Sequence, residues 1–161
     1  MSTNATILVR LRKEDVGRFK KCDLSSLPIK TKKEFGREIL PNIERVKEQT
    51  HKIKLVGDYI EIYHHWDSYA SGLGQVLLEN YNTYEKALNL CLVGDVSSIL
   101  NGVMPYTGYN TDWKENKPDF HNEIPDNYPN YQYVFEDGRW KYRSFHNRIS
   151  TRFYNLCKKS K

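Results

Sequence analysis

Long apolar runs, signal-peptide features and paired cysteines are all missing from this sequence. No apolar run is long enough to span a bilayer, and the opening MSTNATILVRLRKED lacks the apolar stretch and cleavage site of a signal peptide. Cys22, Cys91 and Cys157 are odd in number, far apart and outside any CxxC pair. This excludes a disulfide framework and favours reduced thiols, so we expect a cytoplasmic protein that does not enter a membrane.

Charge of both signs is abundant but unevenly placed. Residues 1–54 carry 14 Lys and Arg against 7 Asp and Glu, residues 55–137 carry 3 against 13, and residues 138–161 carry 8 against none. The basic ends either fold onto the acidic middle or form a separate basic face. We favour the first, because neutralisation within one chain needs no partner. With 39% hydrophobic and 28% charged residues, the whole chain, 1–161, fits a single domain.

Apolar periodicity predicts an α+β fold in which a small antiparallel sheet packs on two to four helices. The expected strands are residues 5–11, a hairpin over 52–66 that turns at Gly57-Asp58, and a hairpin over 131–145 that turns at Asp137-Gly138. Helices are expected over 72–80, from Asn82 to Gly94 with a further turn at 95–98, and in a helical insertion over 15–52 with a capping box at Thr31 and Glu34. The end from Arg148 is a short basic helix or a tail, and 101–130, with four prolines, is a long loop.

The stretch YIEIYHHWDSYASGLGQVLLENY, residues 59–81, delivers two histidines, a tryptophan and an aspartate where a strand turns into a helix. Strand alternation places His65 and Asp67 on the face of Tyr63, and His64 and Trp66 on the opposite face. One interpretation is structural: Trp66 lies in the core, Asp67 caps the turn, and a histidine serves as a buried hydrogen-bonding group. The other is a ligand-holding site.

Three further chemistries are weakly indicated at this turn. Adjacent histidines on a regular strand cannot chelate one metal, and HxH and HExxH spacings are absent, so we expect no metal or other cofactor; a metal would need Asp67 with His121 or His146. Ser68 or Ser71 beside His65 could act as a nucleophile, but the glycine-flanked serine of hydrolases is absent. Gly72 and Gly74 precede a helix whose N-terminal amides could hold a phosphate.

A second candidate surface is the last predicted strand. Arg139, Lys141 and Arg143 alternate with Trp140 and Tyr142, so the three cations share one face. A basic ladder of this kind either binds phosphates or keeps an exposed strand face soluble.

The stretch from Ile62 to Leu100 resembles a family of small uncharacterised proteins of phages and mobile bacterial elements. The signature is IYxHWDGYxxxxGxxLLExY followed by NTxEKVxxLxxxGDxSSL. The chain matches it at Ile62, Tyr63, His65, Trp66, Asp67, Tyr69, Gly74, Leu77, Leu78, Glu79, Tyr81, Asn82, Thr83, Glu85, Lys86, Gly94, Asp95, Ser97 and Ser98. It departs at Ser68, where the family has glycine, and in the insertion over 15–52. The resemblance implies a phage-type accessory protein, and such proteins often interfere with host defences.

These patterns predict a phage-type, anti-defence protein that binds and sequesters a small phosphorylated or nucleotide-like ligand without catalysis, in the host cytoplasm. The expected ligand-binding residues are Tyr63, His65, Trp66, Asp67, Tyr69, Gly74, Arg139, Lys141 and Arg143. One alternative is a protein-directed inhibitor or interaction module of a host enzyme. A further alternative is a small phosphodiesterase-like enzyme with His65 as general acid or base. Nucleic acid, suggested by a pI near 9.0, is the remaining partner class.

Overall fold

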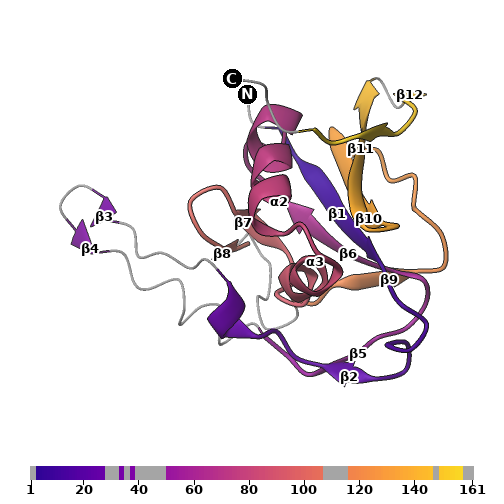
Figure 1. Ribbon diagram of the computed structural model, residues 1–161. Helices are drawn as coiled ribbons and strands as arrows, with labels where there is room; N and C mark the ends of the chain where they lie inside the picture. Colours follow the sequence, from indigo (N-terminus) through magenta and orange to yellow (C-terminus); the bar gives the residue numbers. More distant parts are fainter. Residues whose placement is uncertain are drawn as a thin grey trace.

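A mixed β-sheet with helices on one face organises the chain (Figure 1). The computed structural model describes residues 3–27, 33–34, 37–38, 50–106, 116–146 and 149–157. The sheet strands are β1 (Ala5–Arg10), β6 (Tyr59–His64), β7 (Val96–Ser98), β8 (Met104–Pro105), β9 (Asp119–His121), β10 (Tyr131–Glu136), β11 (Arg139–His146), β12 (Ile149–Ser150) and β13 (Tyr154–Asn155). The described helical elements are the 3-10 turn η1 (Leu24–Ser26), the π-helical turn η2 (Ala70–Gly74), α2 (Gln75–Asn80) and α3 (Tyr84–Cys91).

The fold is α+β as predicted, but the sheet is larger than expected and is not purely antiparallel. Its order is β12-β11-β10-β1-β6-β7-β8, with β13 paired to β11 and β9 paired to β6. The N-terminal strand β1 lies at the centre, parallel to β10 and antiparallel to β6. The two ends of the chain and its middle therefore meet in one sheet.

The hairpin predicted over 131–145 is confirmed as β10 and β11. Its turn residues Asp137 and Gly138 have φ angles of +54° and +77°, which suits a two-residue turn of the I′ type. The hairpin predicted over 52–66 is wrong. β5 (Ile53–Lys54) pairs with β2 (Phe19–Lys20) in a separate small sheet, whereas β6 pairs with β1. Gly57-Asp58 joins two sheets, and the Asp58 N–H donates to the carbonyl of His121.

Other element predictions also differ from the structure. Residues 33–34 and 37–38 of the predicted helical insertion form the paired strands β3 (Lys33–Glu34) and β4 (Arg37–Glu38). Within the same predicted insertion, residues 15–27 contain β2 and η1, whereas residues 28–32, 35–36 and 39–49, with Thr31, lie outside the described residues. The turn of helix expected at 95–98 is strand β7. The C-terminal segment, predicted as a short basic helix or a tail, contains the short strands β12 and β13. The predicted loop 101–130 contains β8 and β9, and its residues 107–115 lie outside the description.

The core lies between the sheet and the two α-helices. Ile7, Val9, Ile60 and Ile62 alternate along β1 and β6 and pack with Leu88 of α3. The buried indole of Trp140 on β11 donates from Nε1 to the Tyr81 carbonyl at 2.9 Å, which fixes the end of α2 against the sheet. On the opposite face a smaller apolar cluster consists of Leu8, Tyr59, Val134, Ile124 and Phe153. No described helix covers that second face, so polar side chains from loops and strands gather there.

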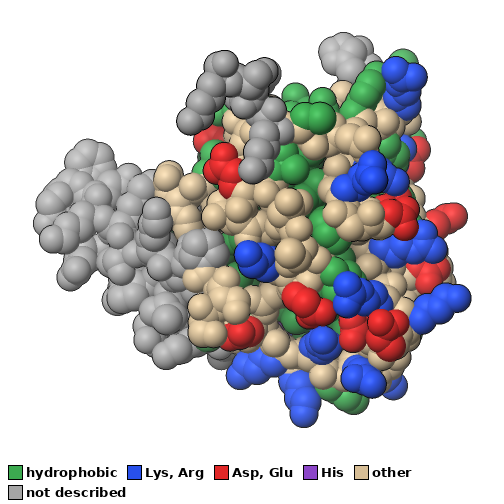
Figure 2. All heavy atoms as spheres, viewed as in Figure 1, with side chains coloured by type: hydrophobic (Ala, Val, Ile, Leu, Met, Phe, Trp, Pro, Cys, Tyr) green, Lys and Arg blue, Asp and Glu red, His purple; other side chains and the backbone are tan. Residues whose placement is uncertain are grey.

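The basic ends of the chain do fold onto its acidic middle. Arg10 and Lys141, one from each end, both pair with Glu136, at 3.5 and 3.4 Å, and Arg12 pairs with Glu85 at 3.4 Å. Figure 2 shows acidic and basic side chains side by side on the helix-bearing face. These three pairs bring part of the basic charge of the two ends against acids of the middle.

Gly94, which follows α3, lies close to the backbone of Asn116. Its φ is +95°, and a Cβ there would lie 2.7 Å from the Asn116 backbone oxygen; Gly17 has a φ of +90° with nothing within 4 Å. Alanine at either position should lose about 1 kcal/mol of unfolding free energy, because a residue with a side chain disfavours a positive φ, but only Gly94→Ala adds a clash with the backbone. We expect Gly94→Ala to lose at least about twice the unfolding free energy lost by Gly17→Ala in urea denaturation. Equal losses would contradict the close approach.

Candidate functional site

The bend after β6 is fixed from several sides. Backbone amides of His65 and Trp66 donate to the carbonyls of Val96 and Ser97 at 3.1 and 2.9 Å, which extends the parallel pairing with β7. Asp67 then adopts a φ of +54°, a left-handed conformation unusual for a residue with a side chain. The Tyr133 hydroxyl donates to the carbonyl of Ser68 at 2.6 Å, so the turn is tied to the neighbouring core.

His64 is the buried anchor of this bend. It is fully buried; its Nε2 accepts from the Ile99 N–H at 3.1 Å, and its Nδ1 lies 2.9 Å from Ser68 Oγ. Because Nε2 is an acceptor, the proton sits on Nδ1, which donates to Ser68 Oγ. Burial, followed by the nearby His65, lowers the His64 pKa to about 3, so the ring is neutral. Of the two histidines, His64 thus fits the structural interpretation.

Ser68 is not an activated nucleophile in this arrangement. Its hydroxyl is fully buried, accepts from His64 and donates to the His64 carbonyl at 3.3 Å. A general base would have to accept the hydroxyl proton, and the His64 nitrogen that faces Ser68 already carries one. The geometry therefore argues against serine chemistry at this position.

Four rings gather beside the bend, and we call Tyr63, His65, Trp66 and Tyr106 the aromatic corner. The His65 centroid lies 4.5 Å from Trp66, 5.0 Å from Tyr106 and 5.7 Å from Tyr63. The Tyr63 hydroxyl lies 2.7 Å from His65 Nδ1. As predicted, Tyr63 and His65 share a face, and the long loop contributes Tyr106. Trp66 does not continue the alternation into the core: it is 47% exposed, and the left-handed bend at Asp67 follows it directly.

Asp95 hydrogen-bonds to the backbone of Tyr63 in the aromatic corner and was not predicted as a functional residue. Its Oδ1 accepts from the Tyr63 N–H at 2.8 Å, and its own N–H donates to Asn116 Oδ1 at 2.8 Å. Burial raises the Asp95 pKa to about 6, and the charges of Asp119 and Glu61 add to this, although the Tyr63 N–H opposes it. The sequence shows Asp95 only as a polar residue after Gly94, which is also the pattern of an ordinary turn.

The predicted phosphate cradle at Gly72 and Gly74 is not formed. The amides of Gly72 and Gly74 donate to the Tyr69 carbonyl, and that of Leu73 donates to the Asp67 carbonyl. A Cβ at Gly72 would lie 2.9 Å from the Asp67 carbonyl oxygen, so glycine is needed there for the close approach of two backbone segments. The amides of this turn are already used.

The remaining predicted residues fall into two groups. Asp67 and Tyr69 are exposed and follow the aromatic corner in sequence, whereas the three cations lie on β11. Arg143 shares the second face of the sheet with Tyr63, in the register row Tyr63, Thr6, Gln132, Arg143. Three strand spacings separate the ends of that row, about 14 Å. Arg139 and Lys141 lie further along β11, and Lys141 is paired with Glu136.

A buried carboxylate on the second face was also missed. Glu61 is 5% exposed and accepts from Asn127 Nδ2 at 3.2 Å, with His121 Nε2 3.0 Å away. His121 therefore belongs near the Tyr59 end of β6, in register with Tyr59, and not with Asp67 as a metal would require. The side chain of His146 lies outside the description. No group of three or more His, Cys, Asp or Glu among the described residues is arranged to hold a metal ion.

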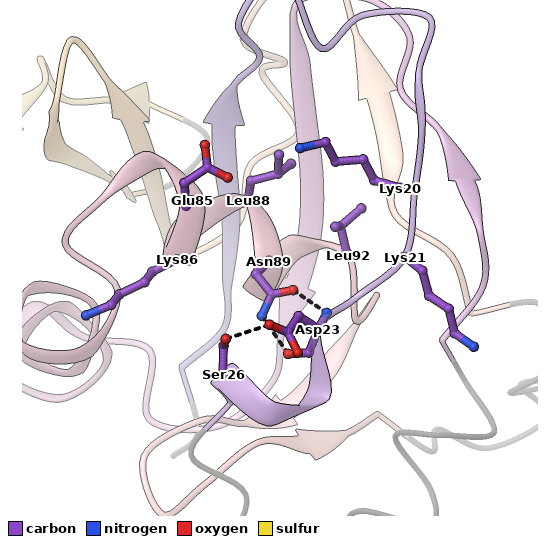
Figure 3. Close-up of a pocket in the computed structure, with 9 residues that line it drawn as sticks. All are labelled: Lys20, Lys21, Asp23, Ser26, Glu85, Lys86, Leu88, Asn89 and Leu92. Carbon is purple, nitrogen blue, oxygen red and sulfur yellow. Dashed lines mark hydrogen bonds between the residues drawn. The ribbon is translucent and has the colours of Figure 1, made fainter.

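Three hollows lined by described residues lie away from the aromatic corner, and no residue of the corner lines any of these three. The first, about 230 Å³, lies between residues 20–26 and α3 (Figure 3). The amino groups of Lys21 and Lys86 point away from it on opposite sides, and Lys20 pairs with Asp15 at 3.6 Å. Its cations diverge, so this hollow is a poor anion site.

A hollow of about 420 Å³ lies beside the η2 turn, which follows Tyr69 in the sequence. It is lined by Ala70, Ser71, Gln75, Tyr142, Tyr154, Asn155, Leu156 and Cys157. It brings the η2 turn and strand β11 together, but through Tyr142 on the helix-bearing face instead of through the predicted cations.

No described helix is long and apolar enough to cross a membrane.

His64 and Asp95 should oppose one another in the pH dependence of stability. Between pH 6.5 and about 3 the unfolded state binds a proton at His64 that the folded state does not, so acidification lowers the unfolding free energy. Between about pH 6 and 3.8 the folded state binds a proton first at Asp95, so acidification raises it. Removing the Asp95 carboxyl should therefore expose the His64 effect.

We expect Asp95→Asn, which keeps an acceptor for Tyr63, to lose unfolding free energy more steeply than the wild type as pH falls from 6 to 3.8. His64→Gln should show a shallower loss than the wild type over the same range. Urea denaturation at stepped pH measures both slopes. Parallel curves for the three proteins would contradict the assigned burial of these two groups.

Comparison of the chain with protein-family models, with curated proteins and with solved structures gave no match. The resemblance to a phage family stays a prediction.

Proposed function

We propose that this chain is a non-catalytic, phage-type accessory protein of the host cytoplasm that binds and sequesters a small nucleotide-like ligand at the aromatic corner. The proposal depends on the four rings of the aromatic corner. The His65 ring lies 4.5 to 5.7 Å, centroid to centroid, from the other three rings, and the Trp66 indole is 47% exposed. An anti-defence role would follow if the ligand is a host signal.

The corner offers what a planar ligand needs. The exposed Trp66 ring is a stacking surface, and base–aromatic stacking contributes about 1–3 kcal/mol per base. Tyr63, Tyr106 and Trp66 hold His65 in place through ring contacts, so little side-chain entropy remains to be lost on binding. No described residue hydrogen-bonds to His65 Nε2, and Asp67, two residues further along the chain, is exposed. Both can contact polar edges of a base.

Binding is favoured over serine-based catalysis because Ser68 and His64 bond to one another in the interior. Arg143 is the β11 cation in register with Tyr63, and three strand spacings, about 14 Å, separate the two residues. We therefore expect the corner by itself to recognise the ring portion of the ligand.

A panel of cyclic nucleotides and ADP-ribose derivatives should contain at least one compound that stabilises the protein. At a concentration 100-fold above Kd, binding adds about 2.7 kcal/mol, which corresponds to several degrees in Tm for a chain of this size. Trp66→Ala should abolish the shift. Phe19→Ala is the matched control, because Phe19 is an aromatic residue 59% exposed on the separate β2–β5 sheet. Absence of any shift across the panel, or its loss in the control as well, would contradict the proposal.

A second candidate is a protein-directed inhibitor, and one observation favours it. Trp66 and Tyr69, three residues apart in sequence, both expose their rings, at 47% and 39%. Exposed tryptophan and tyrosine are typical anchors of protein interfaces. In this case a stoichiometric host protein should co-purify with the wild type and be lost with Trp66→Ala, while nucleotides leave Tm unchanged. Retention of that partner by Trp66→Ala would exclude the corner as the interface.

A further inference from the structure

Arg143 lies half-buried on the second face of the sheet with its guanidinium held on three sides. Its Nε donates to Gln132 Oε1 at 2.7 Å, and Gln132 is fully buried. The Phe145 and Phe153 rings lie 4.9 and 4.6 Å from the guanidinium carbon. Cation–π contacts and one hydrogen bond therefore orient the group before any ligand arrives.

The two Nη groups of Arg143 have no acceptor among the described residues. The other cations in this part of the sheet differ, because Arg10 and Lys141 both pair with Glu136. The charge of Asp126 acts on Arg143 but forms no ion pair with it, and burial lowers the Arg143 pKa, the cost expected of a cation that has given up water without gaining an anion. An oriented guanidinium with two open donors fits a bidentate oxyanion.

Aromatic side chains surround this donor pair. Tyr128, which has a φ of +53° and is 49% exposed, lies edge-on to Phe145 with centroids 6.0 Å apart. A left-handed tyrosine is held there at a conformational cost, and such strain concentrates at functional sites. The surroundings therefore suit an anion that carries an aromatic group.

We infer that the Nη atoms of Arg143 bind the phosphate of an aromatic phosphate monoester, whose ring lies against Phe145, Phe153 or Tyr128. A dianionic phosphate suits the site better than a carboxylate, because the positive potential beside the guanidinium attracts a dianion more strongly than a monoanion, and the Asp126 charge only reduces that potential. This site is separate from the aromatic corner, from which the register places it about 14 Å away. It does not depend on the ligand proposed for the corner.

Phenyl phosphate, inorganic phosphate and benzoate are the probes. Titration of each into the full-length protein, followed by the backbone amide signals of Gln132 and Phe145 in ¹⁵N NMR spectra, gives three dissociation constants. We expect saturable binding of phenyl phosphate, weaker binding of inorganic phosphate and the weakest binding of benzoate. Arg143→Lys keeps the charge but loses the planar fork, and should weaken phenyl phosphate at least about tenfold.

Two further variants test whether the planar guanidinium of Arg143, and not positive charge in general, binds the phosphate. Arg139→Gln removes an exposed cation from the same face of β11 and should bind phenyl phosphate like the wild type. Asp126→Asn removes the opposing charge and should bind it severalfold more tightly, a gain that damage to the fold cannot produce. The inference is overturned if phenyl phosphate does not saturate the wild type, if benzoate binds equally well, if Arg139→Gln weakens binding as much as Arg143→Lys, or if Asp126→Asn brings no gain.

Discussion

A single neutral imidazole holds the candidate site together. His64 closes β6, and its two ring nitrogens tie the strand end to the hydroxyl of Ser68 and to the backbone of Ile99. Both bonds are buried, and each buried polar group left without its partner would cost about 1–3 kcal/mol. The outward turn at Asp67, the exposure of Trp66 and the position of His65 against Tyr106 all follow from this anchored strand end. The structural and the ligand-holding interpretations of the paired histidines therefore each apply to one of them.

The two faces of the sheet divide the tasks of the molecule. The helix-bearing face buries alternating aliphatic and aromatic residues of β1, β6, β10 and β11 and supplies the apolar burial. The second face holds a buried glutamate, a glutamine and an arginine, each with a named hydrogen-bond partner. Buried polar groups of this kind are expensive, and they are retained here beside exposed aromatic residues. Tyr63 and Arg143, one from each proposed binding site, therefore lie on the face that no described helix covers.

Part of the charge in this chain is paired within the fold. Basic residues from both ends meet Glu136 and Glu85 of the acidic middle. Arg143 is the exception on β11, since aromatic rings and an amide, not a carboxylate, hold it. This contrast within one strand separates a solubilising cation, Arg139, and a neutralised cation, Lys141, from one with donors to spare.

Local patterns were sufficient to predict the elements whose causes are local. The β10–β11 hairpin follows from Asp137-Gly138 between alternating residues, α3 from its apolar stripe and its left-handed glycine, and the pairing of Tyr63 with His65 from strand alternation. The N-cap of α3 fell one residue off, at Thr83 instead of Asn82, because both carry capping side chains. Tertiary structure alone decided the rest. Gly57-Asp58 joins two sheets instead of closing a hairpin, because β6 pairs with the longer strand β1. Tyr106, Asp95 and Gln132 reach their sites through pairings between segments far apart in sequence. Turn and helix signals depend on neighbouring residues, whereas strand partners are chosen by the total burial and hydrogen bonding of the whole sheet, which no single segment encodes.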